Sequence, residues 1–495
     1  MAKSSLVLSI FALLILSTLE ADFSQEEIDE FKTPFETRSW KIVEDAIVKY
    51  DFGGCYTPIE VYKFFQLVPV AYPDLFTPWK KIGESRGGQD IFYLSAAIPS
   101  NADESEDVLK KRESILLTAL HDGSTGPSVS FLIYLVHKII YEVTREKNQV
   151  LIDLLENYNI FFIPVVNPEA YINMKDNYPR TGNPRLFHKN GAETNTKCAE
   201  ESQGVSLMHN YDYKFGSQEG SGKSDPCLND YRGETAMSEP EVQAVDSLLK
   251  EFKDNIVYAI NYTGHDNTLV MPYNCCGDKQ LKPEFRAKLD DFLKHGRFPE
   301  GVRGGSPSEL EDIQFSDGDP SDYMTDKYEI LAVTHRLGQN DPKYDTDRFW
   351  PVGDDLRVLL KANALTPLYL LSKLSGLLTV DLISRKVEGC DPFGICSSPL
   401  DRVYTFEYTW QNSGGHSSSA QGFFLKVPKN TKILDVSSSF SLTKENIKVV
   451  KQQEEKEAKN WSLYSFELPE MLSGDVHQVN FSFFERYDEA MNDHD

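Results

Sequence analysis

Residues 114–121 read SILLTALH and residues 158–167 read YNIFFIPVVN, and the segment between them, 126–143, reads GPSVSFLIYLVHKIIYEV. The two short apolar runs have the length of buried strands, whereas the segment between them has the apolar period of a helix. Further strands and helices are predicted by the same criteria at 255–261, 328–334, 238–252 and 354–375. Apolar strands that alternate with helices predict an α/β domain with a mixed, largely parallel sheet flanked by helices.

Two features mark the ends of these elements. Ser238, followed three residues later by Glu241, is typical of a helix start in which the serine caps the helix. Beyond residue 397 the pattern changes, because polar residues alternate with aromatic or β-branched ones. That alternation predicts a small antiparallel β-sandwich. We therefore divide the chain into a signal peptide (1–21), a lead-in segment (22–50), an α/β domain (51–396) and a β-sandwich domain (397–495).

The first residues indicate the compartment. Lys3 precedes an apolar run, Leu6–Leu19, and Ala21 offers a small residue for cleavage. This pattern is typical of a secretory signal peptide, and the alternative is a buried N-terminal helix. No later stretch contains eighteen uninterrupted apolar residues, so no membrane insertion is expected. The sequence predicts a protein that is secreted or held in the endomembrane lumen.

The composition excludes one class of partner. The chain has 495 residues, with 51 Lys and Arg against 76 Asp and Glu, and its formal net charge is −25. A surface of this sign repels phosphate backbones, so nucleic acid is not expected as a partner. Forty percent of the residues are hydrophobic, which is enough for a sizeable core.

The seven cysteines agree with an oxidising compartment, and their odd number leaves at least one unpaired. We expect Cys198 to pair with Cys227, and Cys390 with Cys396. Three glycosylation sequons begin at Asn261, Asn460 and Asn480, and Asn261 is the least accessible because it lies in an apolar strand.

The α/β part, from about residue 56 to 378, resembles the zinc metallocarboxypeptidases of the A/B and N/E types. Besides the strand that ends at His121, the resemblance is carried by five segments: 56–60 (YTPIE), 82–92 (IGESRGGQDIF), 164–171 (PVVNPEAY), 204–212 (GVSLMHNYD) and 230–241 (DYRGETAMSEPE). The layout is most similar to the N/E branch, whose members carry a transthyretin-like sandwich after the catalytic domain. The resemblance implies a carboxypeptidase-like fold.

The resemblance also implies a zinc ion bound by His-x-x-Glu and by a histidine on a later strand. Of these ligands the chain keeps only His121, because Ser124 stands at the glutamate position. Counting nine residues back from Pro272-Tyr273 places Thr263 where the third ligand is expected. Hydroxyl groups bind zinc poorly, so the inherited metal site is predicted to be lost.

The remaining functional positions of the family are substituted as well. The general-base strand, usually T-x-E-L, reads Val333-Thr-His-Arg-Leu, with Thr334 or His335 at the glutamate position. The Asn-Arg pair that would bind the substrate's C-terminal carboxylate is Met208-His209. Arginines of the family are replaced at three further positions: Gly123, His188 and Gly191.

Histidines are concentrated around these positions. Five of the ten fall on or within two residues of them: His121, His188, His209, His265 and His335. One hypothesis is a rebuilt site for zinc or copper, or a pH-sensitive pocket, with Asp122 and Asp266 assisting. The other is that these are polar residues that fill an abandoned substrate cleft.

Three functions follow from this pattern. The leading prediction is a catalytically inactive homologue that binds a peptide or protein, including a free C-terminus, and that needs no cofactor. The first alternative is an active zinc carboxypeptidase with a rebuilt, histidine-rich metal site. The second is an extracellular structural protein that assembles through a β-strand edge and an unpaired cysteine.

Overall fold

The computed structural model separates the chain into two units, Met1–Leu371 and Ser372–Asp495, which are described here one at a time. The predicted boundary between residues 396 and 397 lies inside the second unit. Besides the strands of the second unit, the described residues are 23–47, 55–99, 111–181, 187–193, 198–199, 202–217, 222–264, 266–276, 279–296, 298–299, 301–310, 312–338, 351 and 353–374.

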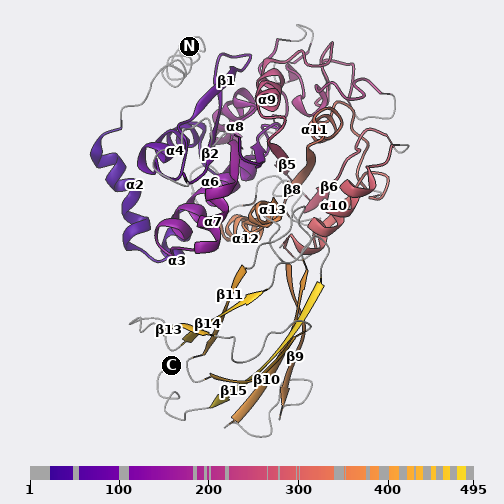
Figure 1. Ribbon diagram of the computed structural model, residues 1–495. Coiled ribbons are helices and arrows are strands. Elements are labelled where there is room, and N and C mark those ends of the chain that lie inside the picture. Colours follow the sequence, from indigo (N-terminus) through magenta and orange to yellow (C-terminus); the bar gives the residue numbers. More distant parts are fainter. Residues whose placement is uncertain are drawn as a thin grey trace. The chain divides into compact units, whose positions relative to one another are not determined.

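An eight-stranded mixed sheet forms the centre of the first unit, with strand order β1-β2-β4-β3-β5-β8-β6-β7 (Figure 1). The four middle strands, β4, β3, β5 and β8, run parallel, and antiparallel pairings join β1 to β2, β2 to β4 and β6 to β8. The bounds are β1 Lys80–Glu84, β2 Asp90–Ala96, β3 Ser114–Ala119, β4 Asn159–Ile163, β5 Ile256–Gly264, β6 Thr268–Val270, β7 Arg303–Gly305 and β8 Leu331–Leu337. This confirms the predicted mixed, largely parallel sheet.

Helices cover this sheet, and two of them show which side chains face which layer. The helices are α2 Gln25–Thr37, α3 Trp40–Ile47, α4 Pro58–Ala71, α6 Gly126–Thr144, α7 Gln149–Asn157, α8 Pro168–Thr181, α9 Pro240–Glu251, α10 Pro283–His295, α11 Pro320–Tyr328, α12 Gly353–Asn363 and α13 Thr366–Leu374. On α6, Phe131 packs against Tyr262 of β5, with ring centroids 4.7 Å apart. On α11, Ser321 hydrogen-bonds Thr334 of β8 at 2.7 Å. In the register of β5 and β8, Tyr262 pairs with His335, the neighbour of Thr334. Successive side chains of a strand point to opposite faces, so Tyr262 and Thr334 face opposite ways. Helices α6 and α11 therefore lie on opposite faces of the sheet.

The central strands are buried on both faces, as parallel strands between two helical layers should be. Every residue of β2, β3 and β4 is buried. This burial explains why the decisive segments of the sequence are continuously apolar instead of alternating.

The predicted cap of the helix at 238–252 is wrong. Helix α9 starts at Pro240, its N-cap residue is Glu239, and no side chain caps it. Ser238 instead donates a hydrogen bond to Glu239 (2.8 Å) and accepts one from the amide of Asn210 (2.9 Å). The carboxylate of Glu241 accepts from the backbone N–H of Arg86 on the β1–β2 turn (2.9 Å). Both polar side chains therefore make tertiary contacts instead of satisfying the first turn of the helix.

The predicted lead-in segment forms two helices, α2 and α3, which pack against α4 and α6. Phe35 of α2 meets the ring of His137 on α6 at 5.5 Å. Trp40 of α3 contacts Tyr134 (5.6 Å), and its backbone N–H donates to the hydroxyl of Tyr141 (3.0 Å). These aromatic contacts make the two helices part of the core of the first unit.

The cysteines bear out one expected pair. Cys198 and Cys227 form a disulfide. Cys275 and Cys276 form a second bond between adjacent residues, which the sequence analysis did not anticipate. Cys55 is reduced and buried. Cys390 and Cys396 lie outside the described residues.

Two antiparallel sheets make up the second unit. One has the order β12-β15-β10-β9 and the other β11-β14-β13. The strands are β9 Thr379–Glu388, β10 Asp401–Gln411, β11 Gln421–Pro428, β12 Thr431–Ser438, β13 Lys448–Gln452, β14 Trp461–Leu468 and β15 Val476–Arg486. The packing of the two sheets into a sandwich stays a prediction. Within the described parts of the chain, no helix combines the length and the apolar character needed to cross a bilayer.

Candidate functional site

His121, the one expected metal ligand that the sequence keeps, follows the end of β3. Its side chain is 1% exposed, and its Nε2 lies 2.9 Å from the hydroxyl of Tyr211. Its Nδ1 has no hydrogen-bond partner among the described residues. Burial lowers the pKa of His121 to about 4, because a charged ring would lose its hydration. The ring is therefore neutral at pH 7.

Ser124, at the position of the second ligand, is engaged by an acid–base pair. The carboxylate of Asp122 and Nδ1 of His188 are 2.8 Å apart. The hydroxyl of Ser124 donates to Asp122 at 2.7 Å and lies 3.2 Å from the same Nδ1. The Asp122 charge raises the pKa of His188. Burial acts to raise the pKa of Asp122, but the charge of His188 and hydrogen bonds from His188 and Ser124 outweigh it and lower the pKa.

Two glycines that stand at arginine positions of the family lie close against the start of α8. A Cβ atom on Gly123 would lie 2.1 Å from the Cβ of Ala170, and one on Gly191 would lie 2.9 Å from Cγ of Glu169. Contacts under 3.0 Å force a neighbour to move, and Ala170 is fully buried in α8. At Gly123 the packing of α8 therefore excludes any larger side chain.

Thr263, at the position of the third ligand, pairs with Arg336 in the parallel register of β5 and β8. The guanidinium of Arg336 donates to the carboxylate of Asp266 at 3.1 Å. Thr334 and Arg336 lie two residues apart on β8 and share a face, whereas His335 between them faces the other way. When the pattern T-x-E-L is aligned on Thr334 and Leu337, the glutamate position is Arg336. The predicted base positions, Thr334 and His335, therefore lie two residues and one residue before it.

Thr334 and His335 occupy different layers. The hydroxyl of Thr334 lies 2.7 Å from that of Ser321 and accepts from the amide of Asn261 at 3.4 Å. His335 is fully buried beside Tyr262 (ring centroids 5.6 Å apart) and Phe298 (5.3 Å). Neither of its ring nitrogens has a partner among the described residues, and burial lowers its pKa to about 3. His335 therefore belongs to the face that packs on α6.

The predicted carboxylate-binding pair, Met208-His209, lies in a single 3-10 turn, η2 Leu207–His209. The amide of Asn261 donates to the sulfur of Met208 at 3.5 Å. Nδ1 of His209 lies 3.1 Å from the backbone oxygen of Asp317 and 3.3 Å from the hydroxyl of Ser316. His209 is 9% exposed. Its ring is thus tied to the segment that precedes α11.

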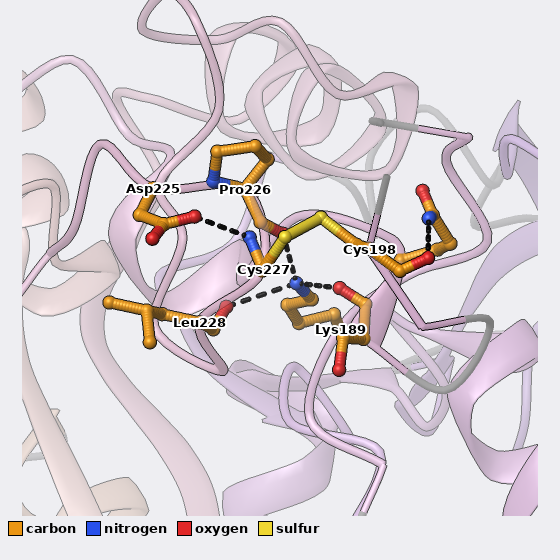
Figure 2. The surroundings of a disulfide bond; sticks show 8 residues. Lys189, Cys198, Asp225, Pro226, Cys227 and Leu228 are labelled. Carbon is orange, nitrogen blue, oxygen red and sulfur yellow. Dashed lines mark hydrogen bonds between the residues drawn. A yellow bond between two sulfur atoms is a disulfide. The ribbon is translucent and has the colours of Figure 1, made fainter. Parts of the chain in front are cut away.

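Lys189 anchors the segment that carries His188. Its ammonium group donates to the backbone oxygens of Ser202, Pro226 (2.8 Å) and Leu228 (3.0 Å). Figure 2 shows the Nζ atom of Lys189 at the centre of these acceptors, next to the Cys198–Cys227 bond. Three carbonyl groups satisfy all three N–H donors of a lysine.

The histidines that the sequence groups together do not share one site. His121, His188 and His209 each have a different partner, and His335 lies on the opposite face of the sheet. His265 lies outside the described residues. Within the part of the chain that the structure describes, no three His, Cys, Asp or Glu side chains are placed so that they could hold a metal ion.

Known proteins share this arrangement of segments. A profile of the zinc carboxypeptidases matches residues 61–341, more than half of the chain. The chain belongs to the zinc carboxypeptidase family. This confirms the resemblance that the sequence motifs indicate.

Three relatives set the scale of the similarity. Carboxypeptidase B of Helicoverpa zea is 26% identical over 221 residues, which are 44% of this chain and 46% of the relative. Mast cell carboxypeptidase A of Mus musculus is 30% identical over 137 residues, 27% of this chain and 30% of the relative. The chain thus spans half or less of these curated relatives.

The solved structure of bovine thrombin-activatable fibrinolysis inhibitor in complex with tick carboxypeptidase inhibitor aligns with a TM-score of 0.52 and 20% identity. That alignment covers 65% of this chain and 97% of the other, and it shows the carboxypeptidase fold.

The residues present do not fit the zinc ion of the family. The three ligand positions offer one imidazole, with an unpartnered Nδ1, and two hydroxyls, and the base position offers a guanidinium. Zinc in proteins takes imidazole, thiolate and carboxylate ligands. One suitable donor among the three ligand positions does not make a zinc site.

Two residues of this site were missed from sequence. Arg336 was available from the spacing of T-x-E-L itself, if the pattern is aligned on its first and last letters. Tyr211 lies two residues after the altered Asn-Arg pair, but nothing in the sequence indicates that its hydroxyl meets His121. That contact joins residues 90 positions apart.

Proposed function

We propose that this chain is a secreted member of the zinc carboxypeptidase family that does not hydrolyse C-terminal residues and that instead binds a peptide or protein. The observation that carries the proposal is the pairing of Thr263 with Arg336 across β5 and β8. At this pair, a hydroxyl and a cation stand on neighbouring strands where the family has a metal ligand and a carboxylate base.

The chemistry of the family needs both groups that are replaced. Zinc lowers the pKa of a bound water so that it attacks the peptide carbonyl, and a carboxylate accepts the proton of that water. Arg336 cannot accept a proton, because a guanidinium stays charged in proteins. Ser124 is held by Asp122 and His188, so it is not free to turn toward a metal.

Substrate recognition is altered in the same way. The guanidinium groups that would bind a C-terminal carboxylate are replaced by His188, Gly191 and His209. The charge of His188 is balanced by Asp122 at 2.8 Å. A free C-terminus therefore has no uncompensated arginine to bind at these positions, and an internal peptide segment is favoured over it. A protein ligand is known for a relative of this fold, the fibrinolysis inhibitor bound to a tick carboxypeptidase inhibitor.

Secretion is supported by the Cys198–Cys227 disulfide, because such bonds persist in oxidising compartments. The predicted signal peptide leads to the same compartment. The structural-protein alternative would use an unpaired cysteine; among the described residues Cys55 is unpaired, and it is buried and therefore unsuited to cross-linking. The active-enzyme alternative would need ligands other than the imidazoles that the structure separates.

The decisive test is peptidase activity with zinc supplied. The mature protein, made without a histidine tag, is incubated with zinc and with acylated dipeptides that end in Phe, Arg or Glu. We expect no turnover above the buffer rate and fewer than about 0.1 zinc ions per chain after dialysis. Turnover that disappears in His121→Ala, but persists in the surface variant Lys250→Ala, would contradict the proposal.

Restoring the family's side chains at three positions is a second test of the proposal. The triple variant Ser124→Glu, Thr263→His, Arg336→Glu restores two ligands and the base. We expect it to bind zinc, measured by competition with a chromophoric chelator, at least about a hundredfold more tightly than the parent chain. Equal affinity in both proteins would show that the lost side chains are not what excludes the metal.

A further inference from the structure

Three glutamate side chains meet at the turn that joins β1 to β2. Glu169 lies in the first turn of α8, Glu239 is the N-cap residue of α9, and Glu241 lies in the first turn of α9. Glu239 is 3% exposed and Glu241 is 0% exposed. Neither the catalytic positions of the family nor the proposed function assigns a role to these three residues, which we call the glutamate clasp.

The clasp holds the backbone of the turn. Glu169 accepts hydrogen bonds from the hydroxyl of Ser85 and from the backbone N–H of Gly87 (3.1 Å). Glu241 accepts one from the backbone N–H of Arg86, between these two residues (2.9 Å). The tip of the turn is exposed to solvent. Acceptors on two helices therefore fasten a turn whose other side has no cover.

Two of the three carboxylates share their partners. Nδ2 of Asn190 donates to Glu239 at 2.7 Å and to Glu241 at 3.1 Å, so both carboxylates lie against one nitrogen atom. Arg86 also bonds both, because its guanidinium donates to Glu239 (3.0 Å) and its backbone N–H to Glu241. Among the ion pairs of the described residues, that of Arg86 with Glu239 is the one that involves the clasp. Three carboxylates thus face one cation.

This excess of negative charge is buried, which favours a bound proton. Oε2 of Glu169 is buried and has no hydrogen-bond partner in the described part of the chain. An oxygen in that position costs less free energy when its carboxyl group is neutral. Burial raises the pKa of Glu169. Burial and, to a smaller extent, the charge of Glu169 raise the pKa of Glu241 to about 7.

The other groups that face the clasp do not change their charge near neutral pH. Its hydroxyl and amide partners are neutral, and the guanidinium stays charged. Tyr62 of α4 interacts with Glu169, and Tyr231 interacts with Glu239, but burial raises the pKa of both phenols. The proton therefore belongs to Glu169 or Glu241.

We propose that the glutamate clasp is a pH-dependent fastening of the β1–β2 turn, closed while Glu169 or Glu241 carries a proton and weakened once both are ionised. In an open clasp Glu241 is hydrated and has its ordinary pKa of 4.5, whereas closure raises that pKa to about 7. The closed state therefore binds more protons than the open one. Its stability is fully present below about pH 4.5 and is lost as the pH rises to about 7. The proposal does not depend on the loss of catalysis.

The test is hydrogen exchange of the full chain between pH 5 and pH 8.5, measured by mass spectrometry on the peptide that spans residues 82–92. Exchange is expressed as a protection factor, which removes the intrinsic pH dependence of amide exchange. We expect this factor to fall at least about tenfold from pH 5 to pH 7.5 and to level off above about pH 8. In Glu241→Gln, which keeps an acceptor for the N–H of Arg86, the fall should be under about threefold.

A second variant keeps the proposal testable if Glu241→Gln does not fold. Glu169→Gln keeps the acceptor for Gly87 and removes the charge that acts on Glu241. The protection factor should then level off at a pH lower by about half a unit. An unchanged levelling-off pH in this variant would overturn the proposal.

Matched controls come from two other carboxylates. Glu84 on β1 is 58% exposed and pairs with Lys81, so Glu84→Gln should keep the parent's fall within about twofold. Glu309 accepts the backbone N–H of Ser306 (2.9 Å), and hydrogen bonds from Ser306 and Arg286 outweigh burial and lower its pKa. The amide of Ser306 should therefore keep its protection factor from pH 5 to pH 8.5. A constant protection factor of the turn in the parent chain, a parent-like fall in Glu241→Gln, or a lost fall in Glu84→Gln would contradict the proposal.

Discussion

Replacing His335 by phenylalanine should stabilise the protein toward acid, because this histidine is buried in an apolar layer of the core. Its side chain is 0% exposed between the rings of Tyr262 and Phe298, and neither ring nitrogen has a hydrogen-bond partner in the described part of the chain. Protonation in the folded state would place an unpaired charge in this apolar layer. His335→Phe removes both nitrogens and keeps an aromatic ring in place.

The magnitude follows from the pKa. Burial lowers the pKa of His335 from 6.5 to about 3. Between these values the unfolded chain holds a proton that the folded chain lacks, so stability falls as the pH decreases through this window. From pH 7 to pH 5 the loss is about 2 kcal/mol, and over the whole window it approaches about 5 kcal/mol. The variant should lack this loss, although the larger ring offsets part of the gain at pH 7.

The assay is guanidinium unfolding of both proteins at pH 7, 6 and 5, with the difference in unfolding free energy plotted against pH. The variant should gain about 2 kcal/mol on the parent between pH 7 and pH 5. His121 has a pKa lowered to about 4, so both proteins should keep the share of acid sensitivity that it causes. A difference that stays constant with pH, or a loss of bound zinc in the variant, would refute the placement of His335 in a dry layer.

Three further outcomes are expected. Replacing Cys198 and Cys227 by serine removes a cross-link between residues with a sequence separation of 29. The gain in chain entropy of the unfolded state should lower the free energy of unfolding by about 3.6 kcal/mol. A decrease under about 1 kcal/mol in denaturant unfolding would contradict this. Lys189→Met leaves three backbone oxygens without their donor and should cost about 3 kcal/mol in the same assay, whereas an unchanged midpoint would show that the ammonium group is not held there. The raised pKa of His188 and the lowered pKa of Asp122 make their pair most stabilising between about pH 4 and 6.5. His188→Gln should therefore destabilise the protein in that window and progressively less above it. A difference in unfolding free energy between the two proteins that does not change with pH would argue against the ion pair.

Much of the fold could be predicted from the sequence because local patterns are sufficient for it. The apolar runs at 114–121 and 158–167 became β3 and β4, since a strand buried on both faces must be apolar throughout. Helix 354–375 was predicted as one element but forms two, α12 and α13, with the break near Ala364. The Cys198–Cys227 pair followed from two cysteines that flank one loop-rich segment.

Part of the candidate site was also decided by the sequence alone. Counting along the sequence from the family motifs is enough to place Ser124 and Thr263 at the expected ligand positions. The residue type alone then says which atoms could bind zinc. The poor fit of these side chains to a zinc ion therefore follows from the sequence without the structure. The base position was misjudged even though the spacing of T-x-E-L, aligned on Thr334 and Leu337, places the glutamate position at Arg336.

Only the tertiary structure decides which layer covers each face of β8, because alternation along a strand defines two faces without saying what packs on them. The register of β5 on β8 sets Arg336 beside Thr263, and His335 lies on the other face beside Tyr262, which packs on Phe131 of α6. The meeting of Tyr211 with His121 likewise joins distant parts of the chain. The sequence by itself determined the elements and the residue types that stand at the expected ligand positions, since these are local properties. The partners of each polar side chain were decided by packing, which brings together residues that no local pattern relates.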